Sequence, residues 1–161
     1  MYYTKSISYN LLPNDSLNEI RAWAETHRDP YSNPVWFNKP NVYKKTGFRP
    51  YINLIKPILD KFEEKNLKPE FASSSRIDPN SSKIGFMYRG GSEVNTIVYV
   101  PLRDYSRNEK IWTIDKRQYG FNTTFIVDKK MTKSIHNNSN NIYSFLVFGF
   151  KKNYNDVIGI L

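Results

Sequence analysis

Residues 127–153 read VDKKMTKSIHNNSNNIYSFLVFGFKKN and decide the fold of this 161-residue chain. The segment NIYSFLVFGF (141–150) is apolar at odd and even positions alike. Because successive side chains of a strand point to opposite faces, this pattern predicts a central strand that is covered on both sides. A shorter apolar segment precedes it, and between the two lies His136, one of two histidines in the chain.

Five further segments have the composition of strands. They are EFASSSRI (70–77), SKIGFMYR (82–89), VNTIVYVPL (94–102), KIWTID (110–115) and NTTFIVD (122–128). Turn-forming clusters such as Asp78-Pro79-Asn80 and Gly90-Gly91 separate them. A run of short strands joined by turns predicts an antiparallel β region over residues 68–161.

Two earlier segments have helical periodicity instead. In NDSLNEIRAWAETHRDP (14–30), Ser16 and Glu19 have the spacing of a capping box ahead of an apolar stripe. PYINLIKPILDKFEEKNL (50–67) carries a second apolar stripe. Pro57 inside it has to kink the helix or begin its main segment.

Helices followed by strands predict an α+β fold. We expect an antiparallel β jelly roll, with two N-terminal helices packed on one side. The chain is predicted to be a single domain, 1–161, with a helical N-terminal part (1–67) and a β jelly roll (68–161).

Composition excludes several kinds of site. The chain has no cysteine, which excludes disulfides, thiolate zinc sites, iron–sulfur clusters and cysteine nucleophiles. Its net charge of +9 favours acidic partners or proximity to nucleic acid. The basic residues are nevertheless scattered, apart from short pairs, and form no arginine-rich arm or zinc finger. The pairs are Lys44-Lys45, Lys129-Lys130 and Lys151-Lys152.

No membrane partner is expected. The longest apolar run, residues 145–150, is far too short to cross a bilayer. The N-terminal MYYTKSISYN lacks the apolar core of a signal peptide. We expect a soluble protein of a reducing compartment or of an assembly built there.

The order and spacing of the β segments resemble the double-stranded β-helix of the Fe(II)/2-oxoglutarate dioxygenases, including the aspartyl/asparaginyl hydroxylase-like group. The resemblance spans about residues 11–151. It rests on VNTIVYVPLRDY (94–105), KIWTID, GFNTTFIVD (120–128), KSIHNN (133–138) and IYSFLVFGF (142–150). The resemblance implies a cupin-like jelly roll with a metal pocket, of the type found in phage proteins.

That resemblance implies an iron site of two histidines and one carboxylate, with positions left open for oxoacid and oxygen. His136 matches the second histidine. The expected His-x-Asp pair is missing from GFMYRGGSE (85–93), where Tyr88 and Arg89 stand instead. The closing strand also lacks the arginine expected to bind the distal carboxylate of 2-oxoglutarate. The metal site is therefore predicted to be degenerate.

Each histidine also has a structural interpretation. His27 and Asp29 form a literal His-x-Asp, but they close the first helix, where His27 continues the apolar stripe. Asp29 precedes Pro30 and looks like a turn residue. His136 would be a hydrogen-bonded turn histidine beside Asn137 and Asn138.

We therefore expect a non-catalytic structural protein without a cofactor, which works by contact with other protein chains. Its aromatic residues suit interfaces, and its composition is typical of a tailed-phage particle or a similar large assembly. It would lie in the virion or the host cytoplasm.

Two alternatives stay open. The first is an Fe(II)/2-oxoglutarate-dependent hydroxylase in which His136 binds iron together with His27 and Asp29, or with a carboxylate such as Glu93. Arg89 or Lys151 would then hold the oxoacid. The second is a basic accessory protein on nucleic acid, which predicts steeply salt-dependent binding.

Overall fold

A computed structural model describes residues 4–8, 18–23, 35–37, 49–84, 94–102, 111–112, 123–128, 134–137 and 140–161. The strands are β1 (Thr4–Ser8), β2 (Val35–Trp36), β3 (Pro69–Ile77), β4 (Ser81–Ile84), β5 (Thr96–Pro101), β6 (Ile111–Trp112), β7 (Thr123–Asp128), β8 (Ser134–Asn137) and β9 (Tyr143–Phe150). The helices are one at 18–23, α3 (Arg49–Glu64) and α4 (Tyr154–Ile160).

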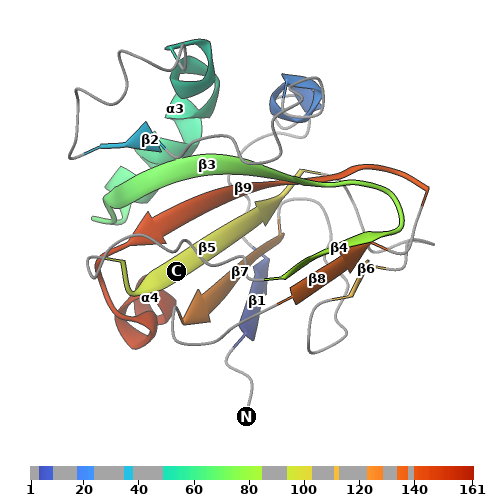
Figure 1. The fold of residues 1–161 in the computed structure, drawn as a ribbon. Helices are drawn as coiled ribbons and strands as arrows, with labels where there is room; N and C mark the ends of the chain where they lie inside the picture. Colours follow the sequence, from blue (N-terminus) through green and yellow to red (C-terminus); the bar gives the residue numbers. More distant parts are fainter. Residues whose placement is uncertain are drawn as a thin grey trace.

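The strands form two antiparallel sheets (Figure 1). The larger has the order β1-β7-β5-β9-β3-β2, and the smaller has the order β4-β8-β6. β9 lies between β5 and β3, and residues 144–150 are all buried. The prediction of a central strand covered on both faces is therefore confirmed, as is the antiparallel arrangement.

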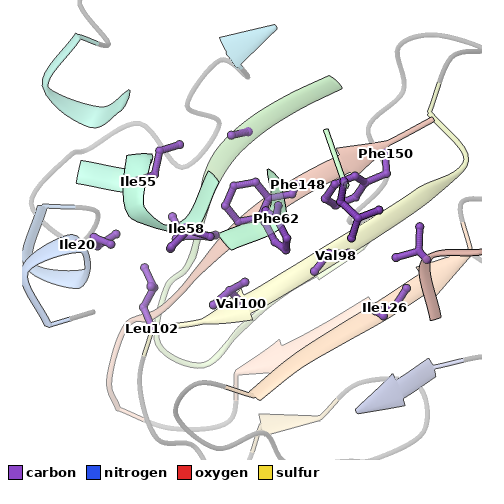
Figure 2. Packing of buried hydrophobic residues seen from close by; sticks show 14 residues of the cluster. Ile20, Ile55, Ile58, Phe62, Val98, Val100, Leu102, Ile126, Phe148 and Phe150 are labelled. Atoms are coloured by element: carbon purple, nitrogen blue, oxygen red, sulfur yellow. The ribbon is translucent and has the colours of Figure 1, made fainter. Parts of the chain in front are cut away.

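β9 sends alternate side chains into two separate cores. Leu146, Phe148 and Phe150 join a buried cluster with α3, which we call the helix-side cluster (Figure 2). The intervening positions of the larger sheet belong to its other face, which we call the inner face. Its buried residues are Phe71, Ile77, Ile97, Tyr99, Val127, Phe145 and Val147.

α3 docks on the sheet through an apolar stripe. Ile55, Ile58 and Phe62 recur at helical spacing and are fully buried. The ring of Phe62 meets Phe148 edge-on with centroids 5.0 Å apart, and meets Phe150 in the same way at 5.3 Å. Burying a side chain of this size contributes about 1.5–3 kcal/mol, so packing holds α3 in place.

Pro57 lies inside α3, so the helix does not begin there. A proline in a helix interior removes one backbone hydrogen bond, to the carbonyl four residues earlier, at a cost of about 3 kcal/mol. That carbonyl belongs to Asn53, and both residues are exposed. Water can therefore reach this turn while the opposite face of α3 stays packed.

α3 ends in a Schellman motif. The amide of Asn66 donates to the carbonyl of Glu63 at 2.8 Å, and the amide of Leu67 donates to the carbonyl of Phe62 at 2.9 Å. Asn66 has the left-handed φ of 57° that this motif requires. The motif satisfies two terminal carbonyls and turns the chain into β3.

Several elements escaped the sequence prediction. β1 pairs with β7 and β2 pairs with β3, so the N-terminal part expected to be helical also supplies both edge strands of the larger sheet. α4 begins at Tyr154, where the side chain of Asn153 accepts a hydrogen bond from the amide of Asp156 at 2.9 Å. In the described part of the chain, no helix combines the length and apolar character needed to cross a bilayer.

Gly149 tests the packing of the inner face. A Cβ added there would collide with the ring of Phe71, which lies over the Gly149 backbone. We expect Gly149→Ala to lower the free energy of unfolding by about 1–3 kcal/mol through overpacking. Urea unfolding measures the change. Gly159→Ala is the matched control, because nothing lies within 4 Å of a Cβ there and alanine favours the helix by up to about 1 kcal/mol. Equal midpoints for both variants would contradict this packing.

Candidate functional site

His136 lies in the middle strand of the smaller sheet. β8 pairs with β4 on one side and with β6 on the other. The register places Ser82 and Trp112 beside His136. The interpretation of His136 as a turn histidine is therefore wrong: pairing on both sides fixes its backbone in a strand, which KSIHNN is too short and too polar to reveal.

The next residue, Asn137, fixes the end of β8. Its side chain is buried, and its Nδ2 donates to the carbonyls of Ile77 at 3.1 Å, Asp78 at 3.0 Å and Asn141 at 2.7 Å. The first two carbonyls end β3 and begin the turn to β4, while the third belongs to the turn before β9. One amide thus ties both turns to the strand that carries His136.

The smaller sheet lies near the start of β9. Figure 1 shows β4, β8 and β6 on the right, away from the arrowhead of β9 and from α4. The contacts of Asn137 agree, because Ile77 pairs with Tyr143, the first residue of β9. At about 3.3 Å per residue, the two ends of β9 lie roughly 23 Å apart.

The structure does not bring Lys151 to His136. Lys151 is exposed and follows the far end of β9, where its carbonyl accepts a hydrogen bond from Nδ2 of Asn95 at 2.7 Å. The other predicted site residues fall outside the described part of the chain. They are His27, Asp29, Arg89 and Glu93.

The described residues do not by themselves form an iron site. Among them, no three histidine, aspartate or glutamate side chains gather where one ion could bind. Ser82 and Trp112, the register neighbours of His136, are not the imidazole and carboxylate ligands that a non-haem Fe(II) site uses. Further ligands would have to come from the segments outside the described ranges.

Tyr99 places a hydroxyl on the inner face. Its neighbours Val98 and Val100 belong to the helix-side cluster, so strand alternation turns Tyr99 the other way. Val147 of β9 and Phe125 of β7 are beside it in register. Tyr99 is 1% exposed and was not among the residues predicted from the sequence. The available signal was a single amphipathic residue in the aliphatic strand TIVYVP.

Burial extends the pH range over which Tyr99 is neutral. Desolvation raises the pKa of its phenol well above the ordinary value, because the phenolate would lose its hydration. Like an ordinary tyrosine, Tyr99 is neutral at physiological pH, and its raised pKa extends this state to more alkaline pH. β9, whose sequence is YSFLVFGF, carries no cation. A carboxylate bound on the inner face would thus meet a hydroxyl there and no ammonium or guanidinium from the closing strand.

No family model matches the chain, and no curated protein matches it. Solved structures do match. AviO1 from Streptomyces viridochromogenes Tue57 has a TM-score of 0.60 and 11% identity, covering 92% of this chain and 89% of AviO1. The viral collagen prolyl hydroxylase vCPH of Paramecium bursaria Chlorella virus-1, solved with 2OG, has a TM-score of 0.57 and 12% identity, covering 91% of this chain and 94% of vCPH. An oxidoreductase of the 2OG-Fe(II) oxygenase family from Burkholderia pseudomallei has a TM-score of 0.52 and 11% identity, covering 94% and 85%.

The chain shares the fold of the 2OG-Fe(II) oxygenases and prolyl hydroxylases. This finding corrects two expectations, a non-catalytic structural role in a viral particle and the absence of a cofactor. Both rest on ligand types missing from the usual positions, and the structural role rests also on aromatic content and composition. Such a pattern concerns a few residues, whereas the structural match extends over more than nine-tenths of the chain, at 91% and 94% for these two neighbours.

Asn137 can be tested as the residue that fixes β8. Asn137→Asp replaces the shared donor by a buried carboxylate facing three carbonyls. We expect the free energy of unfolding at pH 7 to fall by about 3 kcal/mol or more, and the loss to shrink at lower pH, where a protonated carboxyl regains a donor. Urea titrations at both pH values measure it.

Asn140→Asp is the matched control for this variant. Asn140 is exposed, and its Oδ1 accepts a hydrogen bond from Asn80 at 3.4 Å, which a carboxylate can still do. The stability of Asn140→Asp should stay within about 0.5 kcal/mol of the parent. Equal losses at both positions would show that Asn137 has no special role.

Proposed function

We propose that the protein is an Fe(II)- and 2-oxoglutarate-dependent oxygenase in which His136 is an iron ligand. The observation that supports this most is the position of His136 in the middle strand of the smaller sheet, in a chain that has the fold of these oxygenases. Imidazole is a suitable ligand for Fe(II).

The remaining ligands are proposed from the sequence. One set is His27 with Asp29, and the other uses Glu93. Residues 85–93 leave β4 at Ile84, which pairs with Ser134 two residues before His136. At its other end this connection reaches Val94 and Asn95, directly after Glu93, its one carboxylate. Asn95 donates to the carbonyls of Phe150 and Lys151 at the far end of β9, so position speaks against the Glu93 set. Bound iron and oxoacid together would supply the oxygen activation needed to hydroxylate an organic substrate.

The inner face suits a bound oxoacid in two ways. The Tyr99 hydroxyl, which is neutral at physiological pH, would donate to a carboxylate of the oxoacid. The buried side chains around it, such as Phe145, Val147 and Ile97, would exclude water and strengthen that hydrogen bond. Of the two predicted cations, Arg89 is favoured over Lys151, which lies at the far end of β9.

Finer features of the proposal remain predictions. We infer that the two sheets are the layers of a jelly roll and that its ligand set departs from the usual pattern. A phage origin, a location in the virion or host cytoplasm, and contacts with other protein chains stay predictions drawn from composition.

His136 provides the direct test. His136→Ala should weaken Fe(II) binding by at least about 100-fold in an anaerobic titration and abolish oxoacid turnover, because an iron ligand is lost. His27→Ala, which removes the other histidine of the chain, distinguishes the two ligand sets: it retains activity if Glu93 supplies the carboxylate. Unchanged iron affinity and turnover in folded His136→Ala would refute the assignment.

Tyr99→Phe tests the oxoacid contact. Loss of one hydrogen bond to a carboxylate should raise KM for 2-oxoglutarate by about 10-fold or more and leave Fe(II) affinity unchanged. The folded-state pKa of Tyr99 is raised, so the stability that its neutral form contributes is present below about pH 10. It is lost as pH rises further. Tyr99→Phe should lack this alkaline loss, and Tyr154→Phe is the control from the helix-side cluster. An unchanged KM would remove Tyr99 from the site.

A further inference from the structure

A hollow of about 300 Å³ lies at the end of the larger sheet opposite the smaller one. It forms where the start of β3 meets the end of β9, because Pro69 pairs with Phe150. The residues that line it are Asn66, Leu67, Lys68, Phe150, Lys151 and Lys152. Three of these six residues are lysines, and no carboxylate is among the described lining residues.

The backbone that carries two of the lysines is fixed by two side chains at the start of β5, those of Thr96, its first residue, and of Asn95, which precedes it. Nδ2 of Asn95 donates to the carbonyl of Lys151, and Oγ1 of Thr96 donates to the carbonyl of Lys152, both at 2.7 Å. Thr96 is fully buried. These bonds hold the turn in one conformation and engage two carbonyls that would otherwise repel an anion.

The end of α3 is neutralised in a similar way. A helix C-terminus carries partial negative charge on its last carbonyls. Here the carbonyls of Phe62 and Glu63 accept hydrogen bonds from the amides of Leu67 and Asn66 in the Schellman motif. Two carbonyls at this helix end are therefore engaged, and the charged side chains among the described lining residues are the three lysines.

We propose that this hollow binds a phosphate-bearing anion. An ammonium is a compact charge with three donors, and lysine is a common phosphate ligand. The volume accommodates one or two phosphate groups and is small for a drug-sized molecule. Lys68, Lys151 and Lys152 are exposed, and all three line the hollow. The phosphate could belong to a small phosphorylated molecule or to a nucleic-acid backbone, and both have the same recognition chemistry.

Two double variants test the proposal at equal net charge. Lys151→Gln/Lys152→Gln removes two cations of the hollow. Lys56→Gln/Lys61→Gln is the matched control, because these lysines of α3 contact Asp60 at 3.0 Å and Glu64 at 3.7 Å, away from the hollow lining. The probes are inorganic pyrophosphate, measured by calorimetry, and a short single-stranded oligothymidylate, measured by fluorescence anisotropy at several salt concentrations.

We expect the Lys151/Lys152 variant to bind pyrophosphate at least about 10-fold more weakly than the parent, and the control variant to stay within about 2-fold. If the natural source is a nucleic-acid backbone, the slope of log affinity for the oligonucleotide against log salt should also shrink by about 1.4. If the Lys151/Lys152 variant loses pyrophosphate binding but keeps the salt slope of the parent for the oligonucleotide, the site is assigned to a small phosphorylated molecule.

Folding does not confound this test. Removing neighbouring like charges should leave the thermal midpoint unchanged or raise it. Adding Lys68→Gln should weaken binding further. The proposal is refuted if neither probe binds the parent, or if both double variants bind the two probes alike.

Discussion

Burial of β9 on both faces is the constraint on which the rest of the structure depends. Its even-numbered side chains hold α3 through the Phe62, Phe148 and Phe150 rings, and its odd-numbered ones fill the inner face. A strand in this position has no solvent-exposed side, so a slip of one residue would exchange the two cores. The pairing of β9 with β3 and β5 therefore sets the position of every other described strand of the larger sheet, and of the turns at both its ends.

The smaller sheet is joined to this framework at two turns, the one from β3 to β4 and the one that precedes β9. Asn137 makes that connection. The amide holds carbonyls from both turns beside His136. A catalytic group needs a fixed backbone more than it needs a particular neighbour, because misplacement by about 1 Å can reduce rates by about 100-fold. The proposed chemistry thus relies on a residue that has no reactive role of its own.

The sequence predicts the parts of the fold whose signal is local. The two-sided apolar pattern identifies β9, and the helical stripe identifies α3 despite Pro57. β1, β2 and β8 are short, and their pairing depends on partners far away in the chain, so no local pattern reveals them. The same applies to the site. His136 is found by its residue type, whereas Asn137 and Tyr99 acquire their roles only from contacts with Ile77 and Val147.

The ring of Phe71 lying over the backbone of Gly149 has an evolutionary consequence. These two positions are register partners on adjacent strands, and neither can change size alone without a clash or a void. In homologous chains they should vary as a pair, with a smaller residue at position 71 wherever position 149 acquires a side chain. Such covariation would record the thickness of the protein interior at this point.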